Sequence, residues 1–271
     1  MMATADLIRL VKSFGEPFGL ERSIKITRGS LDRERCLLSV GRAAFGEPPQ
    51  DKLIAAARAL RVPEPFAEEL KTSVREADVI HFGYEGASGR GIYKIYCEYA
   101  SSAHRAMANA KQAGANAAPA LVHLAYKWSP SDPDSRAITR YTWVPCRNGG
   151  ELEDRLRILV PQDRAPNAHQ CVFSLLSRIF AVADPTDVML MEVEEPGNPR
   201  RSCDLNVYDA QMQVHQVADL IPAVAAGLSV PKPEVQAAFE GVTNKMLGHL
   251  SAGVDRRGEE FVTVYFGVEA H

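Results

Sequence analysis

The stretch GIYKIYCEYA, from Gly91 to Ala100, has two unlike faces when it is read as a β-strand. Side chains of a strand point alternately to its two sides. One side carries charged and polar groups, and its residues are Ile92, Lys94, Tyr96 and Glu98. The other side carries no charge, and its residues are Tyr93, Ile95, Cys97 and Tyr99. The uncharged face therefore needs a cover, and the polar face needs water or a ligand.

Five further segments divide in the same way: SIKIT (23–27), VIHFGYE (79–85), LVHLAYKW (121–128), SCDLNVYD (202–209) and FVTVYFGV (261–268). Each has one apolar face, which amphipathic helices can cover. The polar faces carry tyrosine, histidine, asparagine, threonine and single lysines, a composition that suits a wet, concave interior. An open sheet whose polar face meets bulk water is the alternative.

Turn signals join these strands into antiparallel hairpins. The hairpins span roughly 78–99, 121–144, 187–208 and 249–268, with a weaker candidate at 22–40 whose second half has a pattern that also fits a helix. Helical patterns separate them, at 50–61, 64–76, 101–114, 150–159, 168–182, 212–227 and 233–247. The repeated order predicts an α+β protein with about ten antiparallel strands. Closing these into a barrel with helices outside would remove the sheet edges. No linker divides residues 1–271, so a single domain is expected.

Composition excludes several classes of function. The formal net charge of −3 and the absence of a basic run argue against nucleic-acid binding. No stretch approaches the ~18 apolar residues of a membrane span. Five scattered cysteines predict free thiols and a cytoplasmic protein. His81, His123 and His249 fall on polar faces, where hydrogen-bonded histidines are the default and a metal trio is the alternative.

The repeat and the YKIY pattern at 93–96 resemble the prenyltransferase-barrel, or ABBA, family. This resemblance implies ten antiparallel strands, built from repeated ααββ units, around a solvent-filled chamber. Members carry lysine-x-tyrosine pairs on chamber-facing strands. The cations hold an allylic diphosphate, and the tyrosines shield the carbocation formed when diphosphate leaves. Lys94 and Tyr96 match such a pair, and Tyr208 and Tyr265 occupy similar places in later hairpins.

The implied activity is transfer of an allylic prenyl group from an isoprenoid diphosphate to an aromatic or peptide acceptor. The substrate-binding residues expected from the resemblance are Lys25, Lys94, Tyr96, Lys127, Arg140, Asp204, Asn206, Tyr208 and Tyr265, with the face of Arg140 ambiguous. Carboxylates can accept the proton that the acceptor loses. The catalytic candidates are Glu98 and Glu85, with Glu192 as a further one.

One segment departs from the family pattern. Asp204-x-Asn206-x-Tyr208 stands where members have arginine-x-lysine-x-tyrosine. An aspartate there would repel diphosphate unless a magnesium ion intervened, so Mg²⁺ is a candidate cofactor. The departure favours an alternative function, in which the barrel binds or transforms another small anionic or aromatic metabolite, or serves as a non-catalytic pathway partner. A third reading is an open sheet that forms a protein–protein surface.

Overall fold

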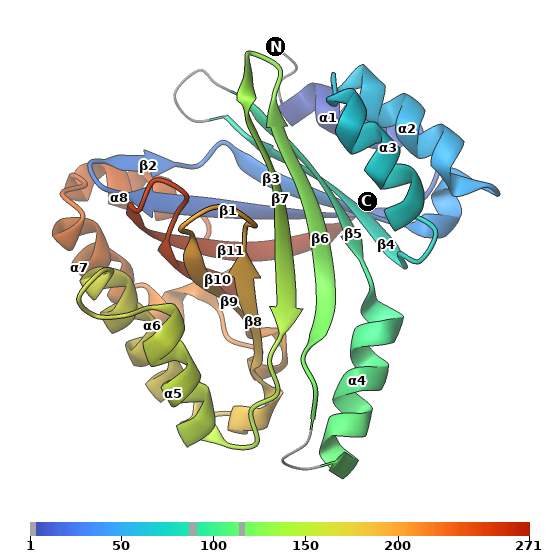
Figure 1. Ribbon diagram of the computed structural model, residues 1–271. Coiled ribbons are helices and arrows are strands. Elements are labelled where there is room, and N and C mark those ends of the chain that lie inside the picture. The colour runs from blue at the N-terminus through green and yellow to red at the C-terminus, as the bar shows by residue number, and fades with distance from the viewer. Residues whose placement is uncertain (1–3, 87–90, 114–116) are drawn as a thin grey trace.

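The computed structural model describes residues 4–86, 91–113 and 117–271 (Figure 1). Strands and helices alternate along the chain in repeated units. The strands are β1 (Phe18–Thr27), β2 (Ser30–Asp32), β3 (Arg35–Gly41), β4 (Val79–Glu85), β5 (Ile92–Glu98), β6 (Ala120–Ser129), β7 (Asp132–Trp143), β8 (Met189–Glu194), β9 (Arg201–Asn206), β10 (Leu247–Val254) and β11 (Glu260–Ala270). The α-helices are α1 (Thr4–Lys12), α2 (Pro49–Ala59), α3 (Glu64–Ser73), α4 (Ala100–Ala113), α5 (Gly149–Leu159), α6 (Pro166–Ile179), α7 (Leu220–Gly227) and α8 (Lys232–Phe239).

The sheet closes on itself. Its order runs β11-β10-β9-β8-β7-β6-β5-β4-β3-β1, and β11 pairs again with β1. All these pairings are antiparallel, and the closing register places Lys25 opposite Thr263. The short β2 pairs with the end of β1 that β3 leaves free. The ten-stranded antiparallel barrel predicted from the sequence is therefore confirmed, and an open sheet is ruled out.

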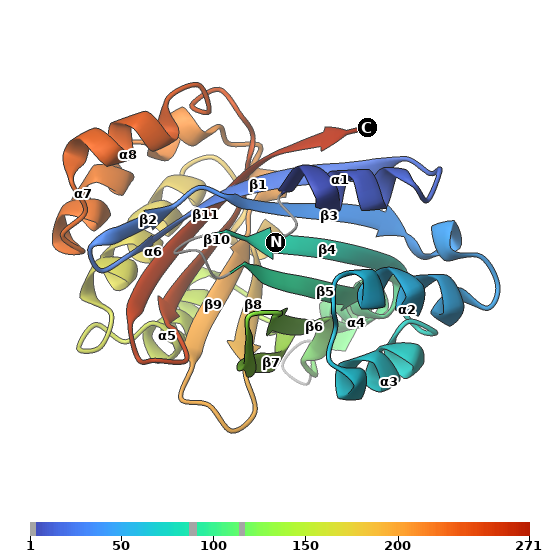
Figure 2. The same cartoon turned by 90° about the horizontal axis from the view of Figure 1, so that it is seen from above.

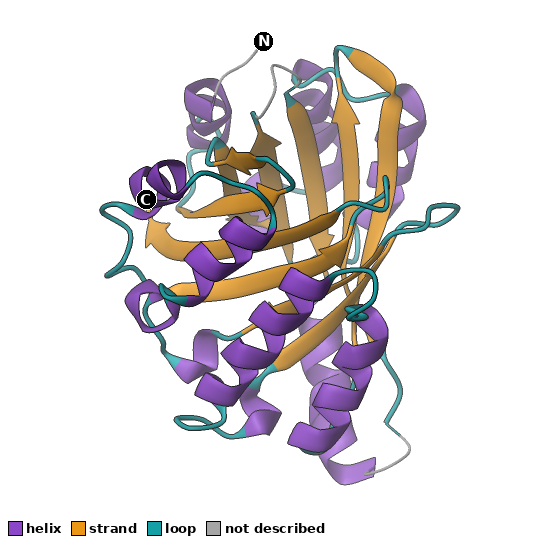
Figure 3. Ribbon diagram, turned by 90° about the vertical axis from the view of Figure 1, so that its left-hand side faces the viewer, coloured by secondary structure: helices purple, strands orange, loops and turns teal. Residues whose placement is uncertain are grey.

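The helices lie outside the barrel, as Figures 2 and 3 show. Apolar residues fill the space between helices and strands in two large clusters, one beneath α1–α3 and the other beneath α5–α8. The uncharged face of β5 belongs to the first cluster, where Tyr93, Ile95 and Cys97 are buried. Trp128 on β6 is also buried there, and its indole N–H donates to the carbonyl of Leu60 at 3.0 Å. The core thus lies outside the barrel, which leaves the interior to polar side chains.

Local details differ from the sequence prediction in three places. The weak hairpin at 22–40 is real, and its second half is strand β3 rather than helix. The helix expected over 212–227 is divided into a 3₁₀ turn at Val214–Val217 and α7. The helix expected over 233–247 ends at Phe239, because the chain is extended at Glu240 and Gly241 has a φ of +79°.

The glycine-rich turn predicted at 86–91 joins β4 to β5, and its residues 87–90 lie outside the described part of the chain. Within the described residues, none of the helices is both long enough and apolar enough to cross a lipid bilayer.

Candidate active site

The barrel interior holds two adjoining cavities of about 480 and 460 Å³. Their linings share four residues: Arg35, Lys94, Tyr141 and Tyr265. We call the first cavity the histidine half, because His81, His123 and His249 line it. We call the second the basic half, for the cations described below. The four shared residues form the boundary between two ends of one chamber.

Six buried or half-buried cations gather in the basic half, and a seventh, Arg257, is exposed at its rim. Three come from strand positions whose side chains alternate inward, and three come from the start of β3 and from the β8–β9 and β10–β11 turns. They are Lys25, Arg35, Lys94, Lys127, Arg200 and Arg256. Lys94 and Lys127 are directly opposite each other on β5 and β6, and each is less than 10% exposed. Such convergence of cations needs internal counter-ions.

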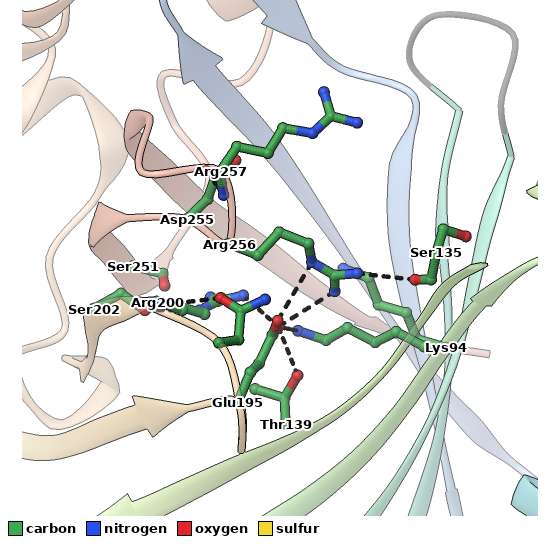
Figure 4. Close-up of polar contacts among 12 residues, drawn as sticks. Lys94, Ser135, Thr139, Glu195, Arg200, Ser202, Ser251, Asp255, Arg256 and Arg257 are labelled. Carbon is green, nitrogen blue, oxygen red and sulfur yellow. Dashed lines mark hydrogen bonds and ion pairs between the residues drawn. The ribbon is translucent and has the colours of Figure 1, made fainter.

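Glu195 is one counter-ion and the centre of the contacts in Figure 4. Its carboxylate lies 3.0 Å from Nη1 of Arg200, 3.3 Å from Nε of Arg256 and 3.4 Å from Nζ of Lys127. The hydroxyl of Thr139 donates to it at 2.9 Å. Burial alone would raise the pKa of Glu195, but Lys127, Arg200 and Arg256 together lower it to about 2. Glu195 is therefore an anion that links four parts of the chamber wall: β6, β7 and the β8–β9 and β10–β11 turns.

Glu85 is the second counter-ion. It forms ion pairs with Lys94 and with Arg35, whose Nη2 lies 2.6 Å away. Burial would raise the pKa of Glu85, but Arg35 and Lys94 hold it well below its usual range. For Lys94, burial outweighs the attraction of Glu85 and lowers the pKa to about 8. Gly83 leaves room for this lysine, since a Cβ there would lie 3.2 Å from the Cβ of Lys94.

Cations slightly outnumber carboxylates among the buried and half-buried groups of the basic half. Its six cations of this kind face five such carboxylates, Asp32, Glu85, Asp132, Glu195 and Asp255, which leaves a formal excess of one positive charge. The exposed rim adds one cation, Arg257, and two carboxylates, Asp134 and Glu259. The convergence of the six cations suits this cavity to a multiply charged anion.

The histidine half pairs each of its carboxylates with a neighbour. Nε2 of His81 lies 2.7 Å from Glu98, and Nδ1 of His249 lies 2.8 Å from Asp204. The hydroxyl of Tyr208 donates to Glu21 at 2.6 Å. These contacts join β1, β4, β5, β9 and β10 across this end of the chamber.

The histidines in this half differ in protonation. Burial would lower the pKa of His249, but the charge and hydrogen bond of Asp204 raise it to about 9. Burial dominates at His123 and lowers its pKa to about 4. At neutral pH, therefore, His249 is a cation and His123 is a neutral ring. The pKa of Glu98 falls to about 2, because the hydrogen bond and charge of His81 outweigh its burial.

A group of tyrosines lies at the boundary. The rings of Tyr96 and Tyr141 are 5.8 Å apart, and Nζ of Lys127 lies 5.8 Å from the ring of Tyr141. Burial raises the pKa of Tyr141 to about 12 and also raises those of Tyr96 and Tyr265. These phenols are neutral and present aromatic surface where the two halves meet.

The structure brings most of the sequence-predicted residues into the chamber and divides them between its two halves. Lys25, Lys127 and Glu85 line the basic half; Tyr96, Glu98, Asp204, Asn206 and Tyr208 line the histidine half; Lys94 and Tyr265 lie at the boundary. Asp204 lies away from the basic half and pairs with His249. Asp204 therefore lies outside the lining of the basic half, where the cations gather.

Two predicted residues point out of the barrel. Arg140 is exposed, because its neighbours Thr139 and Tyr141 on β7 take the inward positions. The expectation that it binds substrate is therefore wrong. Glu192 on β8 pairs with Arg155 of helix α5 on the outer face, so it is not a catalytic candidate.

Sequence reasoning missed several chamber residues. Arg200 and Arg256 lie in or beside turns, where no alternation of faces exists to assign them. Tyr141 was hidden because both faces of β7 mix polar and apolar side chains: Thr139, Tyr141 and Trp143 against Ile138, Arg140 and Thr142. Arg35 lies in the half-hairpin whose pattern also fitted a helix. The available signal was the arginine pair in each of two turns, Arg200–Arg201 and Arg256–Arg257, which the hairpins bring to one end of the barrel.

Comparison with solved structures finds the same architecture elsewhere. NotF in complex with brevianamide F and DMSPP matches with a TM-score of 0.54 and 13% identity, over 91% of this chain and 79% of NotF. The 6-dimethylallyl tryptophan synthase matches with a TM-score of 0.54 and 13% identity, over 92% of this chain and 80% of the synthase. AnaPT from Neosartorya fischeri matches with a TM-score of 0.52 and 11% identity, over 92% of this chain and 77% of AnaPT.

These neighbours are aromatic prenyltransferases of the ABBA type. The chain has the prenyltransferase-barrel fold. No sequence-family model matches the chain, and no curated protein matches it by sequence. At 11–13% identity the likeness is one of fold, so any activity of this prenyltransferase barrel has to be argued from its own residues.

Proposed function

We propose that the chain transfers an allylic prenyl group from an isoprenoid diphosphate to an aromatic or peptide acceptor. The observation that carries the proposal is the convergence of six buried or half-buried cations in the basic half of the barrel chamber. A diphosphate ester is a multiply charged anion, which several converging cations can hold. In a largely desolvated site, charge-assisted hydrogen bonds from lysine and arginine are strong and geometrically specific.

The diphosphate would bind to Lys25, Lys94, Lys127 and Arg200. Stabilising the departing diphosphate promotes cleavage of the C–O bond, whose electron pair leaves with the phosphate oxygen. The remaining allylic cation would lie at the boundary, against Tyr96, Tyr141 and Tyr265. An aromatic face stabilises a desolvated cation by roughly 1–2 kcal/mol. Because burial raises the pKa values of these phenols, they are neutral and not anions that the cation would alkylate.

The acceptor would occupy the histidine half, on the other side of the cation. Its π electrons or a lone pair would form the new bond to the allylic carbon, and its proton would pass to a base. Glu98 is the proposed base, since it lines this half beside His81. Its low pKa suits a strongly acidic donor such as an arenium ion. Glu85 is the weaker candidate, because two cations hold it in the basic half.

Magnesium is a candidate partner of the diphosphate. This ion prefers oxygen ligands, and the rim of the basic half carries carboxylates. The six buried or half-buried cations of this cavity are side chains, so they would also account for binding of diphosphate without the ion. Assays with Mg²⁺ and with EDTA would separate the two cases.

Incubation with labelled dimethylallyl or geranyl diphosphate and a panel of indoles, phenols and peptides tests the proposal. We expect labelled product with at least one acceptor, and thermal stabilisation of the protein by the diphosphates. The control is Arg140→Met, which removes a charge from the outer face and should behave as the wild type. No transfer, and no stabilisation by any diphosphate with or without Mg²⁺, would instead support a barrel for another small metabolite.

A further inference from the structure

Three side chains of the types that bind metal ions lie close together in the histidine half. His81, Glu98 and His123 come from three adjacent strands, β4, β5 and β6. Glu98 and His123 are direct register partners, and one ligand atom from each of the three residues lies within 4.8 Å of the others.

One ring nitrogen of this group is unpaired among the residues that the structure describes. Nδ1 of His123 is buried and has no hydrogen-bond partner there. A buried, unpaired imidazole nitrogen is costly unless it binds something. The ring of His123 packs edge-on against His81, with centroids 5.6 Å apart, and against Tyr141 at 5.7 Å. These neighbours hold its orientation.

His81 already has the outer contact that metal-binding histidines show. Its Nδ1 lies 2.7 Å from the hydroxyl of Ser39, while its Nε2 points to Glu98. In metal sites the ring nitrogen that does not bind the ion usually has such a partner, which fixes the ring and its tautomer. Ser39 lines the same cavity, on the strand next to β4.

We propose that His81, Glu98 and His123 bind a divalent transition-metal ion of the zinc class. Two imidazoles and one carboxylate form a ligand set that such ions accept while keeping positions open for another group. In tetrahedral coordination the ligand atoms would lie ~3.3 Å apart, given metal–ligand bonds of about 2.0–2.1 Å. The 2.7 Å contact between His81 and Glu98 must then lengthen, which rotation of the half-buried glutamate side chain permits.

The open positions of the ion would face the cavity of about 480 Å³. Glu21 and Asp204 line the same half with the cation His249, and the cations Arg35 and Lys94 at its boundary are paired with Glu85, so Glu98 itself supplies the negative charge that binds the ion. A hydroxyl, thiol or ring N–H of a bound molecule is the class of ligand that such an ion takes and makes more acidic. With the ion bound, Glu98 is a ligand, and the ion would activate the acceptor in place of the free carboxylate. Only this last role rests on the proposed prenyl transfer, because metal binding stands without it.

Direct metal titration of the full chain tests the site without an activity assay. The protein is first treated with a chelator, and binding of Zn²⁺ is then measured by calorimetry and binding of Co²⁺ by its visible spectrum. We expect one ion per chain and no competition from Mg²⁺, which prefers oxygen ligands. His123→Ala and Glu98→Gln should weaken zinc binding by about 100-fold, and Ser39→Ala by about 10-fold.

The matched control is His249→Gln, a histidine in the same half that pairs with Asp204 and lies outside the group. It should bind zinc no more weakly than the wild type. A double variant, His81→Ala with His123→Ala, measures zinc taken up by cysteines and surface histidines. Circular dichroism of each metal-free variant confirms that it is folded. Zinc uptake by the wild type no greater than that of the double variant would overturn the proposal, as would an equal loss in His249→Gln.

Discussion

Replacing Lys94 with methionine should weaken the binding of an allylic diphosphate without unfolding the barrel. Lys94 lies at the boundary of the two cavities, is 8% exposed and forms an ion pair with Glu85. Its pKa of about 8 leaves it mostly protonated at pH 7, so the charge is available to the ligand. Methionine has a similar length and no charge, so it fills the same space between β4 and β6.

The size of the effect follows from the surroundings of the lysine. A hydrogen bond to a charged group contributes about 1.5–3 kcal/mol, which corresponds to roughly a 10- to 150-fold change in Kd. Full Coulomb attraction at about 4 Å would approach 4 kcal/mol at an effective dielectric constant of 20, which sets an upper limit. In the variant, Glu85 keeps Arg35 and loses its second cation, so its negative charge near the ligand is less well compensated. We therefore expect the upper part of the range.

Calorimetric titration with a non-ionising thiolodiphosphate analogue at pH 7 measures this change. Arg140→Met is the matched control, since it also removes one positive charge but from the exposed outer face. Its Kd should equal that of the wild type. If Lys94→Met binds the analogue as tightly as the wild type, or if both variants weaken binding equally, the proposed anion site in the basic half is refuted.

Three further predictions concern Lys94, His249 and Trp128. Affinity for the analogue should fall by up to tenfold per pH unit above pH 8, because Lys94 loses its proton there. This pH dependence should be absent in Lys94→Met. A wild-type affinity that stays the same up to pH 9.5 would contradict the assignment. His249→Gln should be less stable than the wild type by up to about 3 kcal/mol below pH 6.5, because it loses the pair with Asp204 that raises the pKa of His249 to about 9 in the folded protein. The difference in stability should shrink as pH rises through 9. Urea unfolding that gives the same difference at pH 6 and pH 10 would count against this prediction. Trp128→Phe should lower the free energy of unfolding by about 2–3 kcal/mol at constant m, since it loses a buried hydrogen bond to Leu60 and leaves a cavity; a change below 0.5 kcal/mol would show that the outer core repacks.

Alternation along the strands made the barrel predictable. A period of two divides β5 into Tyr93, Ile95 and Cys97, which pack under the helices, and Lys94 and Tyr96, which line the chamber. Because every pairing is antiparallel between neighbouring strands and most follow the chain order, local hairpins also specify the topology. Only the pairing of β11 with β1, which closes the barrel, had to be inferred from the advantage of leaving no sheet edge unpaired.

The division of the chamber could not be predicted, since it depends on depth along each strand and on residues outside strands. Lys127 and Asp204 both face inward, yet Lys127 lies at the basic end and Asp204 lies beside His249. Period-two reading says which side a residue takes and nothing of its height in the barrel. Arg200 and Arg256 reach the basic half from turn regions, and their convergence on Glu195 arises only when two hairpins become neighbours. Arg140 failed for another reason: both faces of β7 mix polar and apolar side chains, so alternation alone does not say which face is inward.

A crystal structure of the protein with bound thiolodiphosphate analogue tests the central claim most directly. We predict that the diphosphate group lies in the basic half in contact with Lys94, Lys127 and Arg200, and that the prenyl tail passes the tyrosines toward the histidine half. A diphosphate bound in the histidine half, or a chamber in which saturating analogue leaves no density, would contradict the proposed function.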